Sequence, residues 1–393
     1  MGRDSARAAI SGGRSCTGEL NLTPLHQSEI LAWLKGERPG ALRELYARAD
    51  AVRRANVGDG VHLRGLIEIS SHCERQCMYC GLRKANLNLE RYRMTRAEIE
   101  QCARMAVQLG YGTVVIQAGE DDALTANWIA EIVAWIKRTT PLAVTLSLGE
   151  RSKDDLRLWR EAGADRYLLR FETSDPYLYR TIHPRRFPDR PDRLMLLKEL
   201  KGLGYEAGGG VMVGIPGQSY ASLADDLLAF RDFDLDMIGI GPYIAHPATP
   251  LGSGQLNPPI VPADQAPGNE QMVYKMIALT RILCPKANIP STTALATINR
   301  AHGRMQGLQV GANVVMPNLT PVKYRPLYQI YPAKACIEES AEDCSECLRG
   351  QIRSLNRFPG RGTGKRGELE VNAGVFAKPA SQLVQLEAQS YGG

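Results

Sequence analysis

The sequence has no run of 18 apolar residues, and a transmembrane helix needs about that length. We therefore expect no membrane span and no membrane partner. The first 20 residues also lack the apolar centre of a signal peptide and are typical of a flexible lead rich in Gly, Ser and Arg. Nine cysteines in a chain without a secretory leader then favour a reducing, cytoplasmic location.

Concentrated charge is also missing. The chain has 48 Lys and Arg against 42 Asp and Glu, and the net charge of +6 is spread along its length. A nucleic-acid platform would gather its positive charge, so we expect no nucleic-acid partner. An acidic electron donor or an anionic substrate fits a mild excess better. The six histidines form no His-x-x-x-His or Ser/His/Asp pattern, which leaves hydrolytic catalysis with little support.

Three cysteines stand close together after an apolar segment, 65–70, that predicts a buried strand. Cys73, Cys77 and Cys80 have spacings x3 and x2, so their thiolates could ligate three irons of a four-iron cluster and leave the fourth iron open. A disulfide with a spare thiol, or a zinc site with a distant fourth ligand, are the alternatives. Both are weaker, because cytoplasmic thiols stay reduced and zinc sites usually show a second ligand pair.

Short apolar segments then alternate with helical patterns along the chain. After 65–70 we expect strands at 113–117, 143–147, 166–170, 210–213, 237–240, 289–293 and 312–316. Eight such units favour an α/β fold of the (β/α)8 TIM-barrel type over an open doubly wound sheet. We expect a flexible N-terminus and two leading helices in 1–60, which cover the barrel floor, the barrel itself in 61–335, and a C-terminal extension in 336–393.

Reactive groups in such barrels lie where the strands end. The second strand ends in Gln117-Ala118-Gly119-Glu120-Asp121, where small residues admit a ligand and polar groups can hold an ammonium; a plain turn is the alternative. The fourth ends with Arg170 and Glu172, which we expect to face the lumen. This pair either binds a zwitterionic amino-acid group or is a structural ion pair.

Further candidates follow the later strands. Met212 either packs against a ligand's adenine or fills the core. Thr292 and Thr293 supply hydroxyls that could equally cap the helix expected at 297–305. Beyond the last strand, three tyrosines could position a polar substrate, take part in radical chemistry or form a proline-rich clasp: Tyr324, Tyr328 and Tyr331.

A second trio of cysteines, Cys336, Cys344 and Cys347, has spacings x7 and x2. It could hold another iron–sulfur cluster or be three free thiols. Its place beyond the last strand predicts an accessory site at the surface. Cys102 falls on the apolar stripe of a helix capped at Thr95, so we expect it to pack in the core.

The first trio, with Tyr79 before its last cysteine, resembles the radical S-adenosylmethionine (radical-SAM) superfamily. Over about 42–361, the chain resembles the HydE maturases of FeFe-hydrogenase, in a group with biotin synthase and PylB. The segments that carry this resemblance are 73–81, 91–93, 117–121, 168–173, 213–218, 311–317 and 324–332. The second trio matches an accessory-cluster site found in some HydE proteins and separates the chain from PylB. No cysteine ends an interior strand, which counts against biotin synthase.

The resemblance implies a role for each candidate. Cys73, Cys77 and Cys80 would hold the catalytic 4Fe-4S cluster. Contacts to SAM or to the neighbouring substrate would come from Tyr79, Gln117, Gly119, Arg170, Glu172, Met212 and Arg193. The substrate cavity would be lined by Ala118, Thr145, Thr292, Thr293, Tyr328 and Tyr331. Ala118 stands where many relatives carry a small hydroxyl.

It also implies an activity. In that family the reduced cluster cleaves SAM to methionine and a 5′-deoxyadenosyl radical, which acts on a cysteine-bound iron carbonyl cyanide precursor of the hydrogenase diiron site. The implied partners are reduced flavodoxin or ferredoxin as electron donor, the other hydrogenase maturases, and a small-molecule or organometallic substrate. Two alternatives remain: another radical-SAM enzyme, such as a PylB-like mutase or a biotin-synthase-like enzyme, and a non-enzymatic iron–sulfur electron carrier.

Overall fold

A computed structural model describes residues 25–186 and 191–370. Parallel strands pair in the order β6-β5-β4-β3-β2-β1-β7, and the short β8 pairs with the start of β1. Their bounds are β1 Gly60–Ser70, β2 Thr113–Ala118, β3 Ala143–Ser147, β4 Arg166–Leu168, β5 Glu206–Val213, β6 Met237–Pro242, β7 Val314–Val315 and β8 Phe358–Pro359. Most of these strands are buried along their length, as expected when helices cover a curled parallel sheet. The fold is an α/β barrel of the TIM type.

The prediction of a seventh strand at 289–293 is wrong, because these residues do not form a regular strand. The chain instead makes isolated parallel bridges there, from Asn288 to Met237 and from Pro290 to Val314. Pro290 has no N–H to donate, which interrupts the ladder. The backbone hydrogen bonds from Ile238 N to Asn288 O (3.0 Å) and from Ser291 N to Val314 O (2.9 Å) still bridge β6 and β7.

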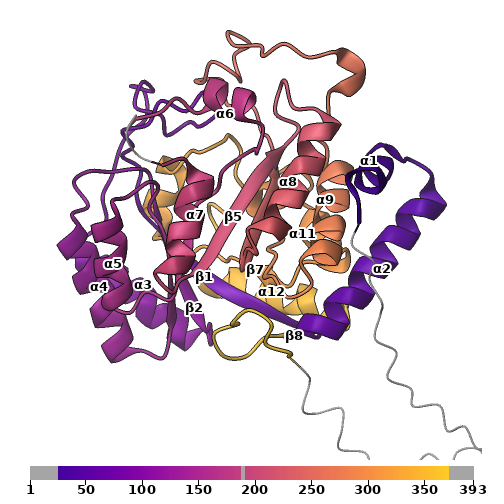
Figure 1. Ribbon diagram of the computed structural model, residues 1–393. Coiled ribbons are helices and arrows are strands. Elements are labelled where there is room, and N and C mark those ends of the chain that lie inside the picture. The colour runs from indigo at the N-terminus through magenta and orange to yellow at the C-terminus, as the bar shows by residue number, and fades with distance from the viewer. Residues whose placement is uncertain (1–24, 187–190, 371–393) are drawn as a thin grey trace, which may run out of the picture.

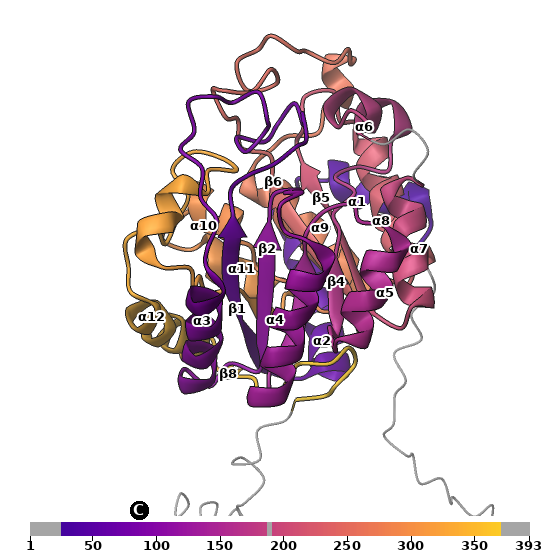
Figure 2. The same ribbon diagram turned by 90° about the vertical axis from the view of Figure 1, so that its left-hand side faces the viewer.

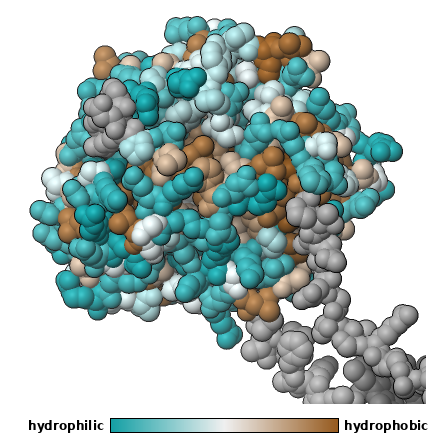
Figure 3. Space-filling model, in the orientation of Figure 1, coloured by the Kyte–Doolittle hydropathy of each residue, from teal (hydrophilic) through white to brown (hydrophobic). Residues whose placement is uncertain are grey.

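Helices surround the strands (Figures 1 and 2). They are α1 Gln27–Lys35, α2 Pro39–Val57, α3 Arg96–Gln108, α4 Ala126–Thr139, α5 Lys153–Glu161, α6 Pro176–Ile182, α7 Arg193–Gly202, α8 Tyr220–Asp232, α9 Glu270–Leu283, α10 Thr293–Ile298, α11 Gly303–Gln309 and α12 Ala341–Ser354, with short 3-10 turns at η1 Pro262–Asp264 and η2 Val322–Leu327. None of the described helices is long and apolar enough to span a membrane. The face in Figure 3 is mainly hydrophilic, with small apolar patches between polar side chains.

Local sequence explains where individual helices begin and end. Thr95 and Glu98 form the expected capping box of α3, and Cys102 is buried, with its thiol donating to Leu319 O at 3.2 Å. The helix expected at 297–305 is wrong, because α10 ends before Asn299. The Asn299 side chain accepts from His302 N at 2.9 Å, an Asn turn that replaces the helical pattern.

The leading helices do not cover the barrel floor. α1 and α2 lie against α8 and α9 on the outer wall (Figure 1), and the Lys275 ammonium of α9 donates to Leu34 O at 2.7 Å. The C-terminal segment 360–370 closes the floor instead, at the amino ends of the strands (Figure 2).

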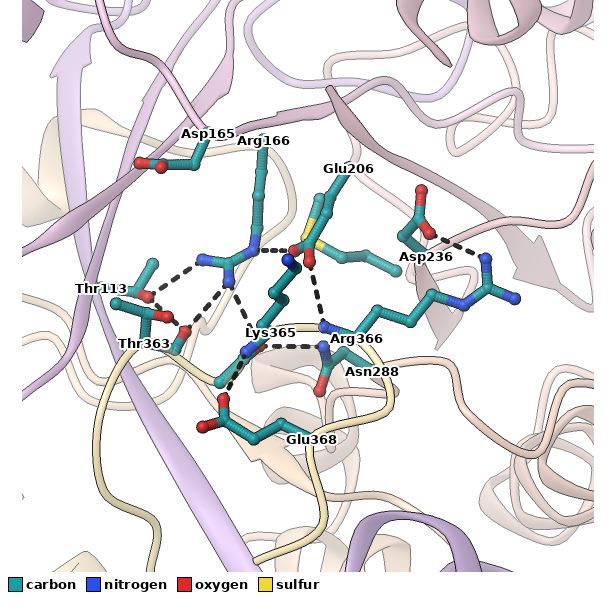
Figure 4. Close-up of polar contacts among 12 residues, drawn as sticks. Thr113, Asp165, Arg166, Glu206, Asp236, Asn288, Thr363, Lys365, Arg366 and Glu368 are labelled. Atoms are coloured by element: carbon teal, nitrogen blue, oxygen red, sulfur yellow. Dashed lines mark hydrogen bonds and ion pairs between the residues drawn. The ribbon is translucent and has the colours of Figure 1, made fainter. Parts of the chain in front are cut away.

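Buried arginines hold this floor segment in place (Figure 4). Arg166 pairs with Glu206 and donates to Thr113 Oγ1 at 3.1 Å. The carbonyl of Gly364 accepts from Arg64 (3.0 Å), Asn288 (3.1 Å) and Arg166 (3.2 Å). A Cβ at Gly364 would lie 2.6 Å from the His62 ring, and its φ is +61°, so this position favours glycine.

Candidate active site

A cavity of about 320 Å³ occupies the lumen and opens where the strands end. It is lined by all three cysteines of the first trio and by every residue expected to contact SAM or substrate. These residues are Cys73, Tyr79, Cys77, Cys80, Gln117, Ala118, Gly119, Thr145, Arg170, Glu172, Arg193, Met212, Thr292, Thr293, Tyr328 and Tyr331. The structure therefore brings together side chains from most of the barrel, as the strand-end rule predicts.

The cysteine loop is tied to three other parts of the chain. Glu74 N donates to Glu120 O at 2.9 Å, Met78 N to Ile182 O at 2.8 Å, and Gly81 N to Ile330 O at 3.1 Å. All eight cysteines in the described residues are free thiols. Burial raises the pKa of Cys77 to about 12. The thiolate form is thus disfavoured until a cation offsets its charge.

Three free thiols on one anchored loop fit the donor set of an iron–sulfur cluster. Among the described residues, no group of three His, Cys, Asp or Glu side chains converges on a single metal ion. A four-iron cluster needs no such convergence, because each thiolate ligates a different iron. The loop also leaves the cavity side of the trio open, which fits an iron without a protein ligand.

Four buried charges lie beside the cysteine loop. The Glu150 carboxylate contacts Arg193 Nε at 2.9 Å and Arg75 Nη1 at 3.1 Å. Glu120 contacts Arg193 Nη2 at 3.2 Å. Burial raises the pKa of Glu120, whereas for Glu150 the effect of burial is outweighed by the guanidinium groups of Arg193 and Arg75, which hold its pKa well below the usual range.

This network changes the interpretation of two expected ligand residues. Glu120 follows Gly119 and was expected among groups that hold an ammonium, but its carboxylate is engaged by two arginines. Arg193 is expected to contact SAM; it does line the cavity, yet it also donates to Glu120, to Glu150 and to Arg170 O at 2.6 Å. Arg193 therefore anchors the wall of the cavity in this structure.

Arg170 and Glu172 both face the lumen, as predicted. Arg170 Nη2 lies 3.2 Å from Glu172 Oε2 and 2.5 Å from Val211 O. β4 ends at Leu168, earlier than predicted, and Glu172 adopts a φ of +64°. Arg170 Nε and Glu172 Oε2 are buried with no hydrogen-bond partner within the described residues. The pair retains hydrogen-bonding capacity that a polar ligand in the cavity can use.

The deeper part of the cavity is polar as well. Gln117 Nε2 donates to the hydroxyl of Tyr328 at 3.2 Å. The hydroxyl of Thr145 is buried and has no partner in the described part of the chain. A buried ion pair between Lys334 and Glu68 also lines this region, and the ammonium lies over the Tyr328 ring at 5.1 Å. Sequence reasoning missed this ion pair, since its members are far apart in the chain.

Two further candidate residues make contacts with neighbouring helices. Thr292 is the N-cap of α10, accepting from Leu295 N at 3.4 Å, so its alternative role as a cap is confirmed while it still lines the cavity. Tyr324, one of the three tyrosines for which a substrate role and a clasp were the alternatives, does not line the cavity. Its hydroxyl donates to Glu98 at 3.0 Å, and its ring stacks on Tyr92 with centroids 4.4 Å apart.

His183 was also missed. It is buried where α6 ends, and its Nδ1 lies 3.2 Å from Cys77 Sγ and 3.2 Å from the Tyr79 hydroxyl. Burial and the Arg193 charge lower the pKa of His183 to about 3, so the ring is neutral at neutral pH. The only sequence signal is its position before Pro184, which is common in loops.

The second cysteine trio does not line this cavity. Cys344 and Cys347 lie on α12, whereas Cys336 precedes it with a φ of +61°. A hydrogen bond from Cys344, together with Arg304 at 3.8 Å, lowers the pKa of Cys336 to about 6. Cys347 is exposed. This group is a separate thiol site on the outer face of the barrel.

Comparison with known proteins defines the class. Residues 67–229 match the Radical SAM superfamily, and this range holds the first cysteine trio, Gln117, Arg170, Glu172 and Met212. The solved structure of methylornithine synthase (PylB) superposes with a TM-score of 0.72 at 25% identity, over 86% of this chain and 95% of that one. HydG, a maturase of the [FeFe]-hydrogenase, superposes with a TM-score of 0.70 at 18% identity, over 87% and 74% of the two chains, and shows the fold alone. The barrel and its cysteine loop are those of a radical-SAM enzyme.

Sequence relatives define the family within that class. The [FeFe] hydrogenase maturase subunit HydE of Thermotoga maritima is 50% identical over 323 residues, which cover 82% of this chain and 88% of the relative. The 3-methylornithine synthase of Methanosarcina acetivorans is 28% identical, over 74% of this chain and 79% of that protein. The chain belongs to the HydE family of [FeFe] hydrogenase maturases.

Proposed function

We propose that this chain cleaves SAM reductively and uses the resulting radical on a cysteine-bound iron carbonyl cyanide precursor of the hydrogenase diiron site. One observation carries the proposal: three free thiols and an incompletely satisfied pair of opposite charges line a single cavity. When bound, a reduced 4Fe-4S cluster with SAM supplies the electron that breaks the bond between sulfur and C5′, giving methionine and a 5′-deoxyadenosyl radical.

Different residues would bind the cluster and the amino-acid group of SAM. Cys73, Cys77 and Cys80 would hold the cluster, and their anchored loop keeps the cavity side open. Arg170 and Glu172 would pair with the carboxylate and ammonium of an amino-acid group, for which their unused hydrogen-bonding atoms are suited.

The remaining contacts are assigned by position. Gln117 and the backbone at Gly119 would contact SAM from the end of β2, and Tyr79 from the cysteine loop. Met212 would pack against the adenine. Arg193 would contact SAM from its place in the cavity wall, where it also donates to Arg170 O.

The substrate would occupy the deeper part of the lumen. Thr145 offers a buried hydroxyl without a partner in the described structure, and Tyr328 offers a phenol already oriented by Gln117. Thr292, Thr293, Tyr331 and Ala118 would complete the wall. The floor segment closes the barrel below this space, where cavity-lining Arg64 donates to Gly364 O, and this closure would limit water and protect a radical from quenching.

The second trio is proposed to hold an accessory cluster. Cys336, Cys344 and Cys347 are free, and the low pKa of Cys336 favours the thiolate that iron binds. Reduced flavodoxin or ferredoxin would supply electrons, and the other hydrogenase maturases would receive the product.

The test is anaerobic reconstitution with iron and sulfide, followed by dithionite and SAM, with 5′-deoxyadenosine measured by chromatography. We expect the nucleoside from the wild type and none from Cys77→Ala. A wild type that assembles its cluster without cleaving SAM would contradict the proposal and favour the electron carrier.

A second assay addresses the substrate. Adding a synthetic cysteine-bound iron carbonyl cyanide complex should increase nucleoside formation and consume the complex. If nucleoside forms equally with and without the complex, and the complex is recovered unchanged, the chain is another kind of radical-SAM enzyme.

A further inference from the structure

His183 is held against the cysteine loop by its backbone as well as by its ring. His183 N donates to Tyr179 O at 2.8 Å, where α6 ends. The preceding residue, Ile182, accepts from Met78 N inside the loop at 2.8 Å. Arg75, also in the loop, donates to Pro184 O at 3.2 Å. The imidazole therefore has a fixed place between α6 and the cysteines.

Both ring nitrogens face specific groups. Nδ1 lies within hydrogen-bonding distance, 3.2 Å, of both Cys77 Sγ and the Tyr79 hydroxyl. Nε2 faces Glu150 Oε1 at 3.5 Å and forms no hydrogen bond within the described residues. Glu150 is itself held by Arg75 and Arg193. The ring is buried, with 1% of its side chain exposed, so water cannot replace either contact.

We propose that His183 is a positioning residue for the cluster: its Nδ1–H donates a hydrogen bond to the Cys77 sulfur and so eases reduction of the cluster. This inference rests on the proposed function, which places iron on Cys77. An iron-bound thiolate has no proton, so the short contact persists as a hydrogen bond only when Nδ1 carries the hydrogen.

The effect on reduction follows from charge. Reduction adds negative charge to the cluster and its sulfurs, and a hydrogen-bond donor stabilises the more negative state. Hydrogen bonds to cluster sulfurs are one of the levers by which proteins raise the reduction potential. A ring that merely filled space would leave that potential unchanged.

Matched variants separate the hydrogen bond from packing. His183→Leu fills the space of the ring with an apolar side chain and removes the Nδ1–H donor. In His183→Asn, the amide nitrogen lies about where Nδ1 lies in histidine, so the donor is retained. Tyr79→Phe removes the other neighbour of Nδ1 and leaves its bond to sulfur.

The measurement is a redox titration of each reconstituted protein, with the reduced cluster followed by electron paramagnetic resonance and iron content determined in parallel. We expect His183→Leu to shift the midpoint potential to more negative values at full iron content. His183→Asn and Tyr79→Phe should stay near the wild-type potential. An unchanged potential in His183→Leu would overturn the proposal and place the ring proton on Nε2, facing Glu150.

A second measurement detects the native His183 ring directly, so it does not depend on whether His183→Leu takes up iron. With 15N-labelled histidine, pulsed electron paramagnetic resonance of the reduced wild type should show a coupling between the cluster's electron spin and a histidine nitrogen. His183→Asn should lack this coupling. Its absence from the wild type would overturn the proposal even if His183→Leu fails to take up iron. A wild type that shows no cluster signal would instead overturn the proposed function, and this inference with it.

Discussion

The two cysteine trios share a count and a final x2 spacing, yet their surroundings are opposite. Cys77 is buried beside a network of paired charges, and burial raises its pKa to about 12. Cys336 lies near Arg304 and Cys344, which lower its pKa to about 6. Burial disfavours the Cys77 thiolate unless a bound cation offsets its charge, whereas the Cys336 thiolate forms without metal. Spacing alone therefore does not determine the chemistry of a cysteine group.

The trios also differ in what they face. The loop of Cys73, Cys77 and Cys80 borders the barrel cavity and is anchored to three other segments. Cys344 and Cys347 project from a single helix, α12, outside that cavity. In the proposed function the first trio would therefore present an open iron to a ligand in the lumen. The second can serve electron transfer or stability, and SAM cleavage should not depend on it.

The largest difference between the two trios should appear in the catalytic cluster when one thiol of each trio is removed in turn. Cys77→Ala should lose the catalytic cluster, about four irons per chain, because two thiolates cannot hold the cubane. Cys344→Ala should keep that cluster. Total iron does not separate the two variants, because Cys344→Ala would lose the proposed accessory cluster. The measurement is the change that added SAM causes in the electron paramagnetic resonance spectrum of the reduced cluster: Cys344→Ala should keep this change and Cys77→Ala should lose it, and its loss from both variants would contradict the assignment.

The next largest effect should be a loss of stability when the charge network beside the first trio is broken. Glu150→Ala should lower the free energy of unfolding by about 3–5 kcal/mol, because Arg75 and Arg193 lose a buried counter-charge. The exposed pair Glu346 and Arg353, near Cys347, is the control. Glu346→Ala should change stability by about 0–1 kcal/mol. Denaturant unfolding of the two cluster-free variants decides whether the network stabilises the fold.

Alkylation of the cluster-free, reduced protein should show the contrast in pKa. The reactive form is the thiolate. The lowered pKa of Cys336 means that its labelling by iodoacetamide rises with pH through about 6 and is near its maximum at pH 8. The raised pKa of Cys77 means that it stays protonated at pH 8 and labels slowly. Peptide mass spectrometry measures both sites, and similar labelling at pH 8 would remove the proposed distinction.

The smallest expected effect concerns Arg304, whose guanidinium lies 3.8 Å from Cys336 Sγ. Arg304→Met removes a positive charge that favours the thiolate. The midpoint of Cys336 labelling should move upward by about one pH unit. A midpoint that does not move would assign the low pKa to the Cys344 hydrogen bond alone.

Sequence reasoning located the parts of the site that are local in the chain. The cysteine spacing, Gln117 at the end of β2, and the pair of Arg170 and Glu172 were each visible within a few residues. Strand ends in a parallel barrel meet at one face, which is why these separate motifs could be placed in one cavity.

The contacts that were missed join distant segments. His183 and Cys77 are 106 residues apart, and Lys334 and Glu68 are 266 apart, with no local pattern to pair them. The floor was assigned to the leading helices, because nothing in the segment around Gly364 predicts that three side chains would bind its carbonyl. The seventh strand failed at Pro290, where an apolar pattern was present without the donor that a ladder needs.

The most direct test of the account is SAM cleavage in a variant in which Cys336, Cys344 and Cys347 are all replaced by Ala. After anaerobic reconstitution and reduction with dithionite, 5′-deoxyadenosine is measured at saturating SAM. The account predicts nucleoside formation within about two-fold of the wild type, because the cavity trio alone would hold the catalytic cluster. Loss of the nucleoside, with the cavity cluster still assembled, would contradict it and assign the second trio a part in the chemistry.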